Sequence, residues 1–159
     1  MDTKELEMVK KEDNLTDNQI KFVKDIVSFF PNNKAVVEKR DIDKHLYEII
    51  IFPNIKNLCS FKFLILKEKS ELLIFINDVK GAYYEGNIND IDTIKEIIRT
   101  VLKSEIKIES FCRKGQDICK KIYLYVDGKE IDTFVYTERL FWKFLYKEKI
   151  EKTYQPWIE

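Results

Sequence analysis

The sequence predicts an α+β fold in which about three helices accompany a mostly antiparallel sheet of six to eight strands. Short segments rich in Val, Ile, Phe and Leu fill the middle of the chain, the connections between them are brief, and helical periodicity appears at both ends and once between. Brief connections imply antiparallel neighbours, because a parallel return needs a crossover of about a dozen residues. The expected order is α-βββββ-α-βββ-α, which favours α+β over a doubly wound parallel fold.

Size and composition are those of one packed domain. The chain has 159 residues, of which 45% are hydrophobic and 13% aromatic. We expect the polar residues 1–14 to form an N-terminal arm and residues 15–159 to form a single domain. The 28 basic and 28 acidic residues balance, so no global field favours nucleic acid or an anionic membrane. Three cysteines without a CxxC pair, and no apolar leader, are typical of reduced thiols in the cytoplasm.

The first helix has the clearest local signals. Thr16 and Gln19 have the spacing of a capping box, and Leu15 and Ile20 occupy the positions of a hydrophobic staple. Apolar residues follow at helical spacing until Pro31 ends the helix. A second helix is expected over residues 90–103, capped by Asn89 or Asp90.

The strands are bounded by turn residues, and a last helix is expected after them. We expect strands over residues 35–39, 46–52, 61–67, 72–77, 82–85, 106–112, 121–126 and 130–136. The final helix is expected over about 138–151, with Leu140, Phe141, Phe144 and Leu145 facing inward.

The hairpin 121–136 carries the most informative surface pattern. A two-residue turn at Asp127-Gly128 would pair Tyr125 with Glu130 and Leu124 with Ile131. Ile122, Leu124, Val126, Ile131 and Val135 would then face the core, and the opposite face would hold Tyr123, Tyr125, Glu130, Asp132, Phe134 and Tyr136. Tyrosines among carboxylates are typical of protein-recognition surfaces. The alternative is that the last helix covers this face.

Three weaker patterns suggest other functions. Asp41, Asp43 and His45 alternate, so on an extended chain they would share a face and could hold a divalent metal for a hydrolase or nuclease. Glu105-Ile106-Lys107 resembles the E-x-K element of restriction-type nucleases, although a helix precedes it where that family has a strand. Arg139, Lys143 and Lys147 would form a basic stripe along the last helix and could contact phosphates. Ordinary surface solvation also explains the first and third patterns, and the Glu-x-Lys tripeptide is common by chance.

Aromatic residues elsewhere complete the set of candidate binding residues. Tyr83-Tyr84-Glu85-Gly86 ends the strand-rich middle, and Trp142 and Tyr154-Gln155-Pro156-Trp157 make an aromatic C-terminal part. Tyr83-Tyr84-Glu85 and Trp157 could each be a binding anchor or part of the core. In size and layout the chain resembles small bacterial toxin-immunity proteins. This resemblance implies a non-catalytic protein that binds another protein, such as a toxin domain, without a cofactor or metal.

Overall fold

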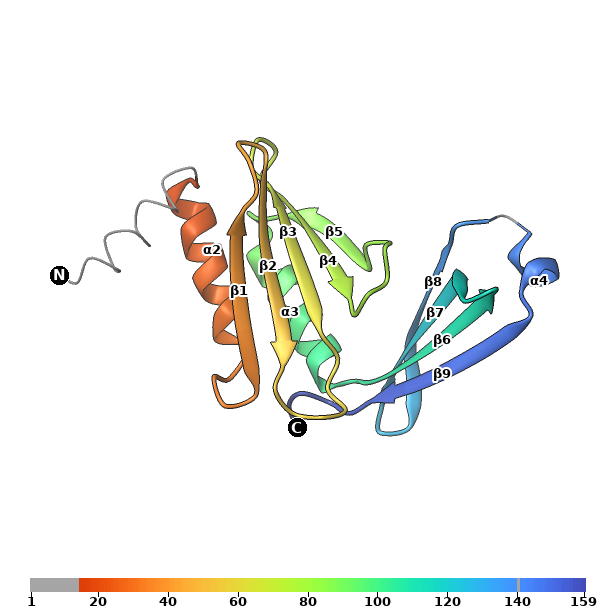
Figure 1. Ribbon diagram of the computed structural model, residues 1–159. Helices are drawn as coiled ribbons and strands as arrows, with labels where there is room; N and C mark the ends of the chain where they lie inside the picture. Colours follow the sequence, from red (N-terminus) through yellow and green to blue (C-terminus); the bar gives the residue numbers. More distant parts are fainter. Residues whose placement is uncertain (1–14, 140) are drawn as a thin grey trace.

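The computed structural model describes residues 15–139 and 141–159, and the expected arm 1–14 lies outside them. Within these residues the chain forms nine antiparallel strands in two sheets, with three helices (Figure 1). The α+β class and the helix count are confirmed. The strands exceed the expected six to eight because one more follows the last helix.

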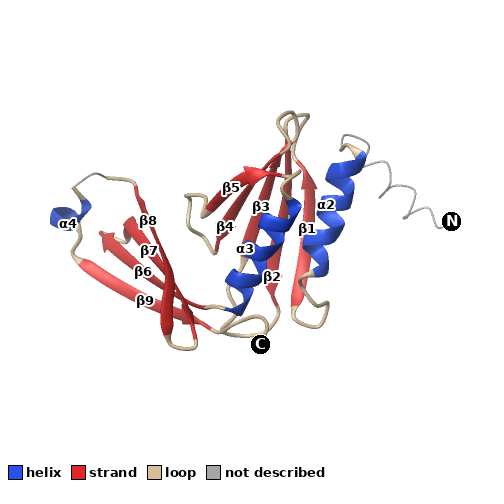
Figure 2. Ribbon diagram, turned by 180° about the vertical axis from the view of Figure 1, so that it is seen from behind, coloured by secondary structure: helices blue, strands red, loops and turns tan. Residues whose placement is uncertain are grey.

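The first sheet is a meander whose spatial order follows the sequence. It contains β1 (Ala35–Asp41), β2 (Leu46–Pro53), β3 (Phe61–Leu66), β4 (Glu71–Ile76) and β5 (Tyr84–Asn87). Helices α2 (Asp17–Ser28) and α3 (Ile91–Lys103) lie on the same side of this sheet, in front of it in Figure 2 and behind it in Figure 1. One face of the first sheet is therefore covered by helices.

Helix α2 begins at the predicted capping box. The Thr16 hydroxyl accepts a hydrogen bond from the Gln19 amide at 3.2 Å, and the Gln19 side chain accepts one from the Thr16 amide at 3.0 Å. Gln19 is also buried, and its side-chain amide donates to the Lys67 carbonyl at 2.9 Å. The same residue therefore caps the helix and attaches it to the end of β3.

The second sheet stands beside the first and extends away from it (Figure 1). Its order is β8-β7-β6-β9, formed by β6 (Glu105–Arg113), β7 (Gln116–Val126), β8 (Lys129–Thr137) and β9 (Glu148–Tyr154). Contacts with the β4–β5 connection join the sheets: Lys120 pairs with Asp78 at 2.7 Å, and Asn77 donates to the Tyr154 hydroxyl at 3.2 Å.

One main hydrophobic core includes residues of both sheets. Ile106, Ile108, Ile122 and Leu124 of the second sheet belong to the same cluster as the helix-facing residues of the first. Trp157 is 1% exposed within it, and its indole N–H donates to the Cys59 carbonyl at 2.9 Å. Trp157 is therefore a core residue and not a binding anchor.

The predicted long final helix is wrong. Residues Trp142–Leu145 form one short helix, α4, and Glu148–Tyr154 then pairs with β6 as β9. The expected inward positions fail with it: Phe141 and Phe144 are exposed, Leu145 packs on a small second cluster, and Leu140 lies outside the described residues. Local periodicity favoured a helix, but the open edge of β6 offered a full ladder of backbone hydrogen bonds, which outweighs a weak local preference.

Candidate protein-binding surfaces

The tyrosine hairpin has a different register from the predicted one. Tyr125 does lie opposite Glu130, as expected, but Leu124 then lies opposite Asp132 and Ile122 opposite Phe134. Ile131 is the extra residue of a β-bulge. Because side chains alternate along a strand, one extra residue exchanges the two faces of β8 beyond it.

The bulge separates the residues that were expected to share one surface. Phe134 turns inward and packs against the main core, whereas Ile131 and Val135, expected to be core, are 44% and 47% exposed. Asp132 accepts a hydrogen bond from the Tyr83 hydroxyl, and Tyr83 meets Phe134 edge-on. Burial and this hydrogen bond raise the pKa of Tyr83. Tyr83, Asp132 and Phe134 therefore join the two sheets.

Tyr123 and Tyr125 remain on the outer face of the second sheet. Their rings stack with 6.4 Å between centroids, and both are half-buried. Burial, and then a hydrogen bond to Glu109, raise the pKa of Tyr123 to about 12. Lys107 lies 5.6 Å from the Tyr123 ring centre.

Glu130 and Tyr84 have local partners. Glu130 is exposed and accepts a hydrogen bond from the Thr133 hydroxyl. Tyr84 is half-buried against the main core, with its ring over Gly86. A binding role for these residues, and for Tyr123 and Tyr125, stays a prediction.

The structure does not bring Asp41, Asp43 and His45 together as a metal site. Asp41 pairs with the buried Lys67 at 2.5 Å, and the Asp43 carboxylate accepts hydrogen bonds from the His45 and Leu46 amides. The His45 amide is the main reason why the pKa of Asp43 is lowered. The His45 ring meets Glu68 at 2.7 Å. Among the described residues no group of three His, Cys, Asp or Glu side chains could hold a metal.

The two remaining patterns also have structural explanations. Glu105 and Lys107 lie on β6 directly after helix α3, and Lys107 approaches both Glu109 and Glu151 at 3.7 Å. Arg139, Lys143 and Lys147 do not line a helix, since α4 has only four residues.

The Cys112 thiol lies beside an acidic side chain that is itself paired with a lysine. Its thiol donates to the Asp117 carboxylate at 3.0 Å, and Asp117 also pairs with Lys120 at 3.2 Å. Burial, and then the Asp117 interaction, raise the pKa of Cys112 to about 11. A thiol that acts as a nucleophile near neutral pH ordinarily has a lowered pKa, which this environment does not provide.

A surface that the sequence analysis missed lies on the first sheet, opposite the helices. The register places the same strand positions on that side throughout: Val36 pairs with Phe52, Leu64 with Leu73, and Leu46 with Leu66. We call this surface the open face. Its apolar members are Val36, Leu46, Ile50, Phe52, Leu64, Leu66, Leu73 and Phe75, and none of them belongs to either core cluster.

No described helix or strand covers the open face, which Figure 1 shows from the front. Val36 and Phe52 are 53% and 41% exposed, while most of the others are half-buried by their neighbours in the sheet. The solvent-facing side of an antiparallel sheet is ordinarily polar. Eight apolar positions on one uncovered face are typical of an interaction surface.

The charges on the open face have an acidic excess. The register adds four carboxylates, those of Glu38, Glu48, Glu71 and Glu85, and two cations, those of Arg40 and Lys62. Arg40 pairs with Glu38 at 2.6 Å, and Lys62 lies 4.5 Å from the Phe75 ring centre. Glu71 and Glu85 lie at the β4–β5 side. A protein that is neutral overall therefore has a locally acidic apolar surface.

The sequence contained a signal for this surface. Strands 46–52, 61–67 and 72–77 have consecutive apolar residues rather than strict alternation, which indicates apolar side chains on both faces. The sequence predicted only about three helices, too few to cover both faces of these strands.

None of the helices in the described ranges is long and apolar enough to cross a membrane. Comparison of the chain with protein-family models, with curated proteins and with solved structures found no match.

Proposed function

We propose that this chain is a non-catalytic protein-binding protein, of the immunity or inhibitor type, which occludes a functional surface of its partner by means of the open face. The observation that carries the proposal is the set of eight apolar side chains outside both cores on an uncovered sheet face. A face of this kind is stabilised when a partner removes it from water.

The charge pattern indicates the chemistry of the partner. Four carboxylates against two cations around an apolar centre complement a partner with an apolar patch and basic surroundings. Toxins that act on nucleic acid need basic active-site surfaces, so such a toxin is a suitable partner. The overall neutrality of the chain is compatible with this, because the acidic excess is local.

The proposed mechanism is steric and requires little rearrangement. The open face belongs to a five-stranded sheet that two helices support from behind, so it is held in shape before binding. A pre-formed surface loses little conformational entropy when it binds. All three cysteines are buried and free, which agrees with a cytoplasmic location.

The decisive experiment uses charge substitutions in the centre of the open face. Wild-type protein is used to capture a partner from its host, and the pair is then purified and measured by calorimetry. Leu64→Lys should weaken binding by about 100-fold or more, because it buries a charge in an apolar contact. Added salt should also weaken binding. The captured partner should lose its own activity in the complex.

Thr93→Lys on helix α3 is the matched control, because it adds the same charge at an exposed position outside both the open face and the tyrosine hairpin. Tyr125→Ala tests the tyrosine surface in the same assay. Equal binding by wild type and Leu64→Lys, or loss of binding only with Tyr125→Ala, would show that the open face is not the binding surface. Circular dichroism of each variant confirms that the fold is retained.

A further inference from the structure

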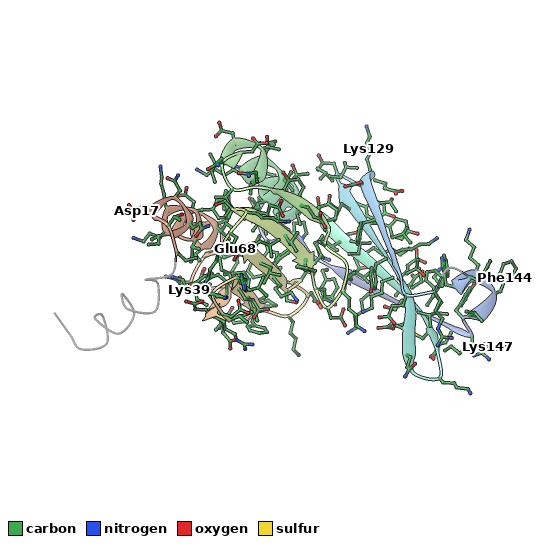
Figure 3. The ribbon with its side chains drawn as sticks, turned by 90° about the horizontal axis from the view of Figure 1, so that it is seen from above. Asp17, Lys39, Glu68, Lys129, Phe144 and Lys147 are labelled. Carbon is green, nitrogen blue, oxygen red and sulfur yellow. The ribbon has the colours of Figure 1, made fainter. Side chains whose placement is uncertain are left out.

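The end of the second sheet that lies farthest from helices α2 and α3 carries two strongly exposed phenylalanines (Figure 1). Phe144 is 86% exposed and Phe141 is 70% exposed, the highest values among the exposed large hydrophobic side chains of the described residues. Figure 3 shows Phe144 and Lys147 together at this end, on the side of the molecule opposite Asp17. We call residues 138–139 and 141–147 the aromatic tip.

The aromatic tip is held firmly by the sheet beneath it. Trp142 is buried against Phe111 of β6, with 4.7 Å between ring centroids, and Tyr146 meets Phe111 at 4.9 Å. The Lys147 amide donates to the Cys112 carbonyl at 2.9 Å, and the Glu138 amide to the Ile118 carbonyl at 3.1 Å. The exposed phenylalanines therefore project from an anchored turn.

Cations lie over the buried aromatic rings that anchor the tip. Lys121 and Lys143 lie 5.1 and 5.9 Å from the Trp142 ring centre, and Lys149 lies 6.0 Å from the Phe111 ring centre. Arg139 and Lys147 are in the tip itself. Lys149 already pairs with Glu109 and with Glu151, each at 2.9 Å, and Glu138 pairs with Lys80 at 2.8 Å. Lys121, Arg139, Lys143 and Lys147 therefore remain as the basic side chains of this end, with Glu148 beside them.

We infer that the aromatic tip docks on the surface of an anionic lipid bilayer, with Phe141 and Phe144 inserted at the headgroup–acyl boundary. Aromatic rings favour that boundary, and basic residues near an anionic leaflet are attracted to its negative potential. A fluid bilayer accepts projecting rings without a matching pocket, which suits a convex tip. The balanced charge of the whole chain had argued against a membrane, but the local excess is basic.

This inference is independent of the proposed function. The aromatic tip belongs to the second sheet and the open face to the first, so the two surfaces share no residue. A membrane-docked molecule would keep its open face available to a protein partner.

Vesicle co-sedimentation tests the inference directly. The full chain is mixed with vesicles of phosphatidylcholine alone, or with vesicles in which roughly one third of the lipid is phosphatidylglycerol. We expect binding to the anionic vesicles only, weakened by salt, and reduced about tenfold for each of Phe141→Ser and Phe144→Ser. Both rings are exposed, so these variants should fold normally, which circular dichroism checks.

Phe52→Ser, which removes an exposed phenylalanine from the open face, is the matched control and should bind vesicles as wild type does. Failure of wild type to sediment with anionic vesicles would overturn the inference. So would binding that is unchanged in the Phe141→Ser/Phe144→Ser double variant. A single-stranded oligonucleotide is tested in parallel, and binding to it alone, with the same dependence on the two phenylalanines, would assign the tip to nucleic acid instead.

Discussion

Phe134 of β8 lies opposite Ile122 of β7. The Phe134 ring meets the ring of Tyr83, in the β4–β5 connection, edge-on with 6.0 Å between the ring centroids. This contact exists because the bulge at Ile131 exchanges the two faces of β8. A regular two-residue hairpin would have turned Phe134 outward and Val135 inward.

The bulge predicts a large loss of stability at one residue and almost none at its neighbour. Phe134→Ala should lower the free energy of unfolding by about 2–3 kcal/mol, because it removes a ring packed on the main core. Val135→Ala should change it by less than about 0.5 kcal/mol, because Val135 is largely in solvent. Urea unfolding measures both. A larger loss for Val135→Ala than for Phe134→Ala would show that the hairpin has the regular register without the bulge.

The capping box should contribute measurably to stability. Thr16→Ala removes the acceptor for the Gln19 amide and should cost about 1 kcal/mol, which lowers the melting temperature by a few degrees. Thr93→Ala, at an exposed position inside helix α3, is the control and should leave the melting temperature unchanged or slightly higher. Equal melting curves for wild type and Thr16→Ala would contradict the predicted role of the cap.

Lys67 is buried, and it should contribute far more to the free energy of unfolding than an exposed lysine with a similar partner. Its ammonium group contacts the Asp41 carboxylate at 2.5 Å and the Asp43 carbonyl at 2.6 Å. Lys67→Met leaves both groups without this cation and should cost about 2–3 kcal/mol of unfolding free energy in urea. Lys80→Met breaks the exposed pair with Glu138 and should have no measurable effect. Similar losses in the two variants would show that burial does not decide the difference.

The three thiols should be present but protected. Cys59, Cys112 and Cys119 are buried, and burial is the main cause that raises the pKa of each of them. Labelling with a thiol reagent near pH 8 should be slow in the native protein and should reach three thiols per chain in denaturant. Because the pKa of Cys112 is raised to about 11, its native reactivity should rise as the pH approaches that value. A stable intramolecular disulfide in a host extract would contradict the cytoplasmic proposal.

Acid should weaken the second sheet through Glu109. Burial opposes ionisation of this carboxyl group, but hydrogen bonds from Lys149, at 2.9 Å, and from Tyr123 prevail and lower its pKa below 4.5. A lowered folded-state pKa stabilises the fold above pH 4.5, and that contribution is lost as the pH falls through the folded-state value. Glu109→Gln should therefore cost about 1 kcal/mol at neutral pH, and its difference from wild type should shrink in acid. Glu96→Gln, exposed on helix α3, should show no such dependence when urea unfolding is repeated across this pH range.

The candidate site was only partly predictable. Tyr123 and Tyr125 lie on the outer face as the hairpin pattern indicated, because they precede the bulge. Asp132 and Phe134 do not, because a bulge has no sequence signature as specific as the Asp-Gly turn. The open face was visible in the consecutive apolar residues of three strands, but only the placement of both helices on the opposite side shows that it is uncovered.

The sequence by itself determined the local elements: the capping box of helix α2, the strand segments, the Asp127-Gly128 turn and the α+β class. These depend on interactions between residues a few positions apart, which composition and spacing express directly. The tertiary structure decided the rest: the division into two sheets, the bulge at Ile131, and the strand β9 over Glu148–Tyr154, whose first residues belonged to the helix expected over about 138–151. Strand pairing depends on partners distant in sequence, and the unpaired backbone edge of β6 outweighed the weak helical preference of the segment that covers it.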